Sequence, residues 1–121
     1  MDRQLMVMGD RDRIAQVFIN LLNNSIKYGK DDGKVTIDIL DIDGQPWIEV
    51  KDNGIGISSE HLPRLFERFY RVGKSRSRHE GGSGLGLAIV KHIIDAHDQT
   101  ITVASKEGKG TTFTFTLQKA R

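Results

Sequence analysis

The sequence predicts one α+β domain spanning residues 1–121. We expect a two-layer sandwich, with about three helices on one face of a mixed, mostly antiparallel sheet of about five strands. The order of the patterns predicts this class, because strand, helix, strand, strand, helix, helix, strand and strand follow one another. The length supports one core, and no apolar run is long enough for a transmembrane helix. The chain has no cysteine, which excludes disulfides and thiolate metal sites.

The first long element is a helix that begins at the N-cap signal Gly9-Asp10 and ends near Tyr28. A short strand over residues 5–8 precedes it. The apolar residues of this helix recur at helical spacing and define its buried face: Ile14, Val17, Phe18, Leu21 and Leu22.

A β-hairpin follows the helix. Residues 35–39 alternate between apolar and polar types, as in a half-buried strand. Asp43-Gly44 is a hairpin turn signal, and the returning strand runs from Trp47 to Lys51 and ends at Asp52.

The second half contains a long segment without an apolar pattern. A short helix is expected over residues 61–67, and residues 70–84 then carry mostly Gly, Ser and Arg, at a length typical of functional or disordered loops. Helical spacing returns over residues 85–97, with Ile89, Ile93 and Ala96 on one face. The last two strands are expected over residues 100–105 and 111–117.

Polar residues line one edge of the first helix. Asn20, Asn24 and Lys27 are spaced so that they form one stripe beside the buried face. An amide oxygen suits a hard cation such as Mg²⁺, and a lysine suits phosphate. The alternative is a solvated, amide-rich helix face.

Two further features suit a nucleotide. Asp52 is followed by Gly54 and Gly56, so that a carboxylate could accept a hydrogen bond from an amine while the chain turns under a flat ring. The alternative is ordinary turn chemistry. A glycine-rich helix start over residues 82–87 could bind an anion at free N–H groups, although its spacing is not that of a dinucleotide-binding motif.

The charge distribution indicates a local anionic partner. The net charge is only +2, but residues 64–79 hold six basic residues and one acid. Arg68 and Arg71 can reach phosphate oxygens from a segment anchored by Phe66 and Phe69. The alternative is a solvated basic loop. One basic segment on a slightly acidic body argues against a nucleic-acid partner.

Together, five segments resemble the ATP-binding catalytic domain of bacterial sensor histidine kinases. The N box is matched by QVFINLLNNSIKYG, the first glycine box by DNGIGI and the F box by LFERFYRV. The second glycine box is matched by GGSGLGLAIV and the last by GKGTTFTFTL. The resemblance covers nearly the whole chain and implies the Bergerat sandwich shared with DNA gyrase B, which holds ATP beneath a mobile lid.

The resemblance also implies residue roles. Asn24 would coordinate Mg²⁺ that bridges the phosphates, and Asp52 would bind the adenine amino group. Asn20 and Lys27 would support the metal and phosphates, and Tyr28 would border the nucleotide. Further nucleotide contacts are implied at Gly54, Gly56, Ile57, Gly82, Ser83, Gly84, Leu85, Gly86, Leu87 and Thr112.

The remaining roles concern transfer of the phosphoryl group. Arg68 and Arg71 would steady the γ-phosphate or the partner domain. Two positions depart from the family pattern: Ser25 replaces the usual alanine, a change that we expect to be tolerated, and Gly73 stands where many relatives have an aspartate.

One position distinguishes a kinase from an ATPase. In the hydrolysing relatives, a glutamate four residues before the metal-binding asparagine activates water, and this chain has Asn20 there. An amide cannot act as a general base, a role that contributes roughly 10²–10⁴-fold to rate. ATP is therefore expected to await a stronger nucleophile, such as a neutral imidazole, and transfer would depend on positioning and charge neutralisation.

The phosphoacceptor histidine of the family lies on an N-terminal dimerisation domain, and no histidine precedes the N box here. We therefore expect a fragment, monomeric in isolation and inactive in self-phosphorylation. It would be the cytoplasmic domain of a membrane-anchored sensor kinase whose parent passes phosphate to a response regulator. Two alternatives are a serine kinase of the anti-sigma type, and a degenerate nucleotide-binding module acting as an interaction domain.

Overall fold

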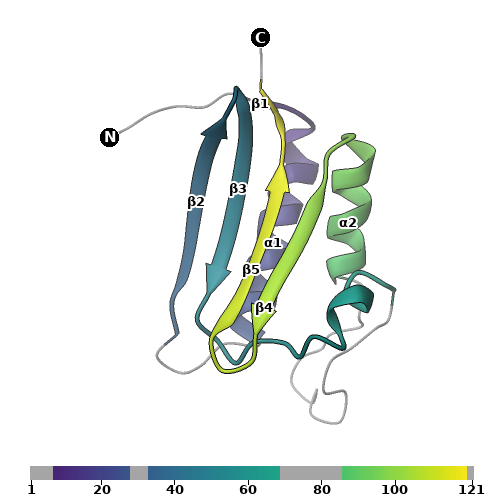
Figure 1. Cartoon of the computed structure of the whole chain (residues 1–121). Coiled ribbons are helices and arrows are strands. Elements are labelled where there is room, and N and C mark those ends of the chain that lie inside the picture. Colours follow the sequence, from purple (N-terminus) through teal and green to yellow (C-terminus); the bar gives the residue numbers. More distant parts are fainter. Residues whose placement is uncertain (1–6, 28–32, 69–85, 120–121) are drawn as a thin grey trace.

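The computed structural model confirms the α+β two-layer sandwich (Figure 1). It describes residues 7–27, 33–68 and 86–119. The elements in these ranges are β1 (Val7–Met8), α1 (Arg11–Lys27), β2 (Val35–Ile42), β3 (Gln45–Asp52), the 3-10 helix η1 (Leu62–Arg64), α2 (Gly86–Ala96), β4 (Ile101–Lys106), β5 (Gly110–Thr116) and β6 (Gln118–Lys119). No helix among them is long and apolar enough to span a membrane.

The main sheet has four antiparallel strands in the order β2-β3-β5-β4. The turn expected between β2 and β3 is present, and Asp43 (φ 53°) and Gly44 (φ 83°) both have the positive φ of a tight hairpin. Strand β6 was not expected. It pairs with β1 through Val7 and Lys119 and forms a separate two-stranded ribbon.

Both α-helices lie on the same side of the main sheet (Figure 1). The expected buried face of α1 is confirmed, because Val17 and Leu21 are fully buried and the other apolar residues of the face pack against the core. Phe18 contacts Phe115 edge-to-face with ring centroids 5.5 Å apart. The core therefore lies between the helix layer and the inner face of β3, β5 and β4.

The buried face of α2 differs from the expected one. Val90, Ile93 and Ile94 are buried, whereas Ile89 is 41% exposed and Ala96 is exposed. Only Ile93 was placed correctly. Helix α2 is apolar on more than one side, so its spacing allowed several faces, and the packing against α1 and the sheet decides between them.

The short helix expected over residues 61–67 is a series of 3-10 turns around η1. The backbone N–H of Arg64 donates to His61 O at 3.0 Å, and Glu67 N donates to Arg64 O at 3.0 Å. These bonds span three residues instead of four. Pro63 lacks an N–H group and lies at the start of the segment, where that loss costs least.

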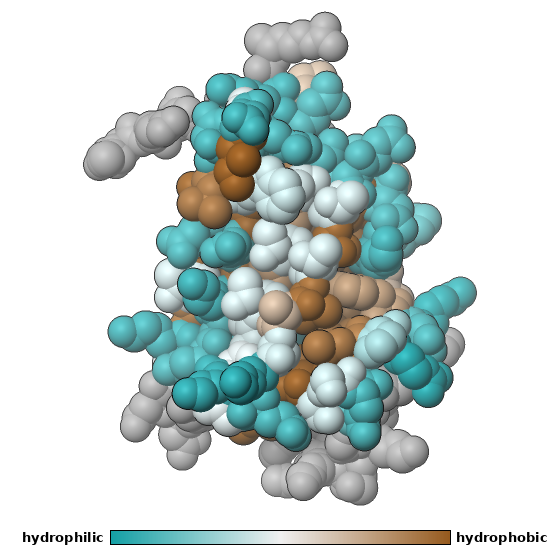
Figure 2. Space-filling model, viewed as in Figure 1, coloured by the Kyte–Doolittle hydropathy of each residue, from teal (hydrophilic) through white to brown (hydrophobic). Residues whose placement is uncertain are grey.

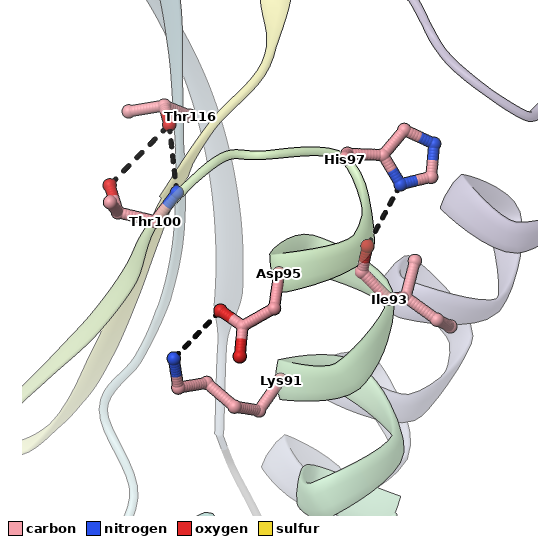
Figure 3. Close-up of polar contacts among 6 residues, drawn as sticks. All are labelled: Lys91, Ile93, Asp95, His97, Thr100 and Thr116. Atoms are coloured by element: carbon pink, nitrogen blue, oxygen red, sulfur yellow. Dashed lines mark hydrogen bonds and ion pairs between the residues drawn. The ribbon is translucent and has the colours of Figure 1, made fainter.

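The two α-helices are tied together at one end by a histidine. His97 Nδ1 lies 2.8 Å from Ile93 O in the last turn of α2 (Figure 3), and Asp10 N donates to His97 Nε2 at 3.0 Å. Asp10 is also the N-cap of α1, because its Oδ1 accepts from Asp12 N at 3.1 Å. Because Asp10 N–H donates to Nε2, Nδ1 is the ring nitrogen that can donate to Ile93 O.

We predict that His97→Ala lowers the free energy of unfolding by about 1 kcal/mol, because Asp10 N–H and Ile93 O both lose a partner. Urea denaturation measures this change. His92→Ala is the matched control on the same helix, since His92 is exposed, and it should change stability by less than about 0.5 kcal/mol. Equal effects of the two substitutions would contradict the proposed tie.

Candidate functional site

The expected site residues that the structure describes gather at one end of the sandwich. Strand β3 ends there, while β5 and α2 begin there (Figure 1). Helix α1 approaches the same end, because Asn20 Nδ2 donates to the backbone oxygen of Gly86, the first residue of α2, at 3.2 Å. The two helices and the end of β3 are thus brought together as the sequence predicted.

Asp52 projects from the end of β3 toward the helix layer. It is paired with Thr111. Ile48, Val50 and Asp52 follow one another at two-residue intervals along β3, so Asp52 lies on the same face of the sheet as these two buried residues. Its Oδ1 accepts a hydrogen bond from Gly54 N at 2.9 Å. The side chain is half-buried, and its second oxygen has no hydrogen-bond partner among the described residues. Asp52 therefore makes a turn and still offers one free acceptor.

The loop after Asp52 is held closely against the turn between β4 and β5. Gly108 N donates to Ile55 O at 2.8 Å. A Cβ on Gly56 (φ +77°) would collide with the backbone oxygen of Lys106, and one on Gly110 (φ +129°) would collide with that of Asp52. Only glycine fits at these two positions.

A hydroxyl network reinforces this contact and was not foreseen from the sequence. Ser105 Oγ accepts from Ile57 N at 2.8 Å, donates to Gly110 O at 2.9 Å and lies 2.8 Å from Thr111 Oγ1. Gly54 and Ile57 are buried, so these two expected contact positions form the wall of the site.

The two asparagines of the polar stripe are both half-buried, but they are used differently. Asn20 accepts from Gln16 Nε2 at 2.7 Å and donates to Gly86 O, so both ends of its amide are engaged. Asn24 makes no hydrogen bond to any described residue. Its amide oxygen is therefore available, and a neutral oxygen of this kind fits a hard cation.

Ser25 is the unexpected member of the site. It is 2% exposed, and its hydroxyl has no hydrogen-bond partner among residues 7–27, 33–68 and 86–119. It follows Val17 and Leu21 at four-residue intervals on the buried stripe of α1, so it faces the sheet. A buried hydroxyl without a partner destabilises the fold in which it lies.

Thr112, which the resemblance implies as a nucleotide contact, does not lie on the same face of the sheet as Asp52. Thr112 is paired with Lys51 and Ala104 on the face of the sheet opposite the helices. Thr111, 5% exposed, lies on the Asp52 side. The sequence indicates this placement, because Thr111, Phe113 and Phe115 follow one another at two-residue intervals and therefore lie on the same, core-facing side of β5.

Part of the expected site lies outside the described residues. This part comprises Tyr28, Arg71, Gly82, Ser83, Gly84, Leu85 and the side chain of Lys27. Of the remaining positions, Gly86 is exposed at the start of α2, Leu87 packs against the core and Arg68 is exposed. Residues 7–27, 33–68 and 86–119 contain no cluster of three His, Cys, Asp or Glu side chains that could hold a metal.

A family model described as histidine kinase-, DNA gyrase B- and HSP90-like ATPase matches residues 9–121. The chain is 49% identical over 118 residues to sensor histidine kinase WalK of Bacillus subtilis, which covers 96% of this chain and 19% of the relative. It is 48% identical over 113 residues to sensor-like histidine kinase SenX3 of Mycobacterium tuberculosis, covering 93% and 28%. The chain therefore spans only a fraction of the length of these relatives.

Solved structures agree. The mycobacterial sensor histidine kinase MprB superposes with a TM-score of 0.84 at 31% identity, covering 93% of this chain and 76% of that one. The catalytic domain of histidine kinase ThkA, in a nucleotide-free form, superposes with a TM-score of 0.78 at 33% identity, covering 95% and 73%. The resemblance drawn from the five sequence segments is confirmed.

We predict that Ser25→Ala raises the free energy of unfolding by about 1–3 kcal/mol, because it removes a buried hydroxyl that has no partner. Thermal or urea unfolding of the ligand-free chain measures the change. Alanine also favours helix, so Asn23→Ala on the exposed side of α1 is the control, with an expected gain of at most about 0.7 kcal/mol. A gain at Ser25 no larger than the control would contradict the prediction.

Proposed function

The chain belongs to the family of histidine kinase-, DNA gyrase B- and HSP90-like ATPases, and from this premise we propose that it binds Mg-ATP and transfers the γ-phosphate to a histidine. The nucleotide would lie at the end of the sandwich where β3 stops and α2 starts. The acceptor histidine would lie on a separate dimerisation domain of a two-component sensor kinase.

The position of Asp52 is the observation that carries the proposal. A half-buried carboxylate on the helix side of the sheet has one oxygen fixed by Gly54 N–H at 2.9 Å and the other without a described partner. The free oxygen can accept a hydrogen bond from the exocyclic amine of adenine. Gly54 and Gly56 have no Cβ, so a flat ring can approach the backbone closely.

The phosphate end would be held from α1. Asn24 presents an amide oxygen that no described residue uses, which fits a magnesium ligand. Mg²⁺ bound between the phosphates would neutralise charge that develops on the transferred group. Lys27 and the arginines Arg68 and Arg71 remain proposed phosphate contacts on the strength of the resemblance.

Asn20 supports the assignment as a kinase and not a hydrolase. Its amide is committed to Gln16 on one side and to Gly86 on the other. It therefore positions the start of α2 and offers no base that could take a proton from water. Without general-base help, attack by water is slowed roughly 10²–10⁴-fold, whereas a neutral imidazole needs no deprotonation before it attacks.

The partners follow from the relatives' greater length. The chain spans about a fifth of WalK and about a quarter of SenX3. We propose that the dimerisation domain, the membrane anchor and the contact with a response regulator belong to the rest of a parent protein. The isolated chain would then be a monomeric cytoplasmic domain that does not phosphorylate itself.

We predict that Asp52→Ala weakens binding of Mg-ATP about 10–100-fold, because a hydrogen bond to a charged group is lost. Asn24→Ala should weaken binding only when Mg²⁺ is present. Titration calorimetry with and without EDTA measures both effects. Asp38→Ala is the control, since Asp38 is exposed on β2 and lies on the opposite face of the sheet. Unchanged affinity in Asp52→Ala would refute the proposed site.

We also predict that the isolated chain with Mg-ATP shows little hydrolysis and no phosphorylation of itself. Adding a separately purified dimerisation domain of a relative, such as WalK, should give acid-labile phosphate on that domain. Radiolabelled ATP followed by acid and alkali treatment distinguishes the products. Acid-stable phosphoserine on an added protein would instead favour the anti-sigma type of serine kinase.

A further inference from the structure

A hollow lies on the open face of the sheet, away from the helices. Its volume is about 490 Å³, and its floor is formed by short side chains on the outer face of the strands. Thr36, Thr112 and Ala104 lie in one row across the sheet with Lys51 between them. Ala104 is the smallest of the four, and its methyl group leaves the row open on the β4 side.

Four lysines surround this hollow. They are Lys34, Lys51, Lys106 and Lys109. Three of them belong to different strands: Lys34 immediately precedes β2, Lys51 lies in β3 and Lys106 ends β4. Lys51 pairs with Thr36 on the open face, and Lys34 and Lys106 are each two residues from an open-face residue, so all three lie on that face. Figure 2 shows this face, where hydrophilic side chains are prominent toward its lower end.

The backbone fixes the anchor points of these flexible side chains. Lys34 N donates to Asn53 Oδ1 at 2.8 Å, and Lys109 N donates to Lys106 O at 3.0 Å. The lysines therefore start from set positions at opposite sides of the hollow. From β2 to β4 the sheet spans three strand spacings, or roughly 14 Å.

These positive charges are not balanced from within the described structure. None of the four ammonium groups forms an ion pair or a hydrogen bond with a described residue. Asp52 is the one acidic residue among the lining residues, and its place in the register puts its side chain on the helix side of the sheet. Glu49 lies on the open face one row away and is not among the lining residues. A hollow in which positive charge predominates concentrates anions.

We propose that this hollow is a second, independent anion site that binds a soluble small molecule carrying two or more phosphate groups. A lysine ammonium forms strong charge-assisted hydrogen bonds to phosphate oxygens. The lysines stand on both sides of a hollow wider than one phosphate, so a ligand with linked phosphates can engage both sides. No lining residue is aromatic, so the site recognises phosphate and offers no stacking surface for a base.

The test uses the whole isotope-labelled chain, with inorganic tripolyphosphate as the probe in EDTA at fixed ionic strength. Amide chemical shifts should move and saturate at Thr36, Lys51, Ala104 and Thr112. Lys51→Gln combined with Lys106→Gln should weaken binding at least about tenfold, because each removes a charge-assisted bond. Lys91→Gln combined with Lys119→Gln removes the same charge elsewhere and should change the affinity less than about threefold.

Several outcomes would overturn the site. These are equal weakening in the two double variants, shifts that do not saturate, and shifts confined to Asn24 and Gly86 at the nucleotide site. A glutamate-rich peptide of equal charge that binds as tightly would overturn the phosphate assignment. Asp52→Ala keeps the four lysines, so tripolyphosphate should bind this variant at least as tightly as the unchanged chain, whereas Mg-ATP should bind it about 10–100-fold more weakly. The two proposals can therefore fail separately.

Discussion

The contact between the loop after β3 and the turn before β5 determines where the carboxylate of Asp52 can point. At Gly56 and Gly110 the two backbone segments approach so closely that a Cβ would collide with a main-chain oxygen. Ser105 adds bonds from both sides of this contact, to Ile57 N and to Gly110 O. With the loop held in this way, one oxygen of Asp52 is fixed on Gly54 N–H and the other is left available.

Two side chains fix the positions of α1 and α2 relative to each other. Asn20 joins α1 to the first residue of α2, and His97 joins the last turn of α2 to the N-cap of α1. These two ties lie at opposite ends of an antiparallel helix pair. Together these two contacts fix how α1 is aligned along the axis of α2, and they therefore fix the position of Asn24. Asn20, which the family resemblance assigns to the metal and phosphates, therefore also has a structural role.

Sequence reasoning predicted the elements well where one period was unambiguous. The N-cap at Asp10, the buried face of α1 and the Asp43-Gly44 turn are all present. Predictions from the sequence failed where the sequence was compatible with more than one buried face or more than one type of helix. Helix α2 is apolar on more than one side, so its buried face depends on packing. The 3-10 helix η1 depends on local three-residue bonds near Pro63. The position of Thr112 on the open face follows from the sequence, because Thr112 is adjacent to Phe113 and therefore lies on the opposite face of β5 from Phe113 and Phe115.

The candidate site divides in the same way. Its strand and helix positions could be placed from the sequence because their spacing is regular, whereas the Ser105 network joins residues whose proximity only the fold creates. The spacing of Ser25 after Val17 and Leu21 indicates that Ser25 is buried, but spacing cannot predict which groups its hydroxyl would contact. Buried polar groups without a partner are few in folded proteins, and a functional role is one of the reasons for which they are retained.

Adjacent side chains of β3 point to opposite faces of the sheet, so two neighbouring residues place opposite charges on its two sides. Lys51 points to the open face and Asp52 to the helix layer. The proposed nucleotide site and the hollow rimmed by lysines can therefore share one strand end, because the sheet lies between their charged groups. A shift of β3 by one residue would exchange the two side chains. The buried residues Ile48 and Val50 prevent that shift, so the core that stabilises the fold also keeps the two environments apart.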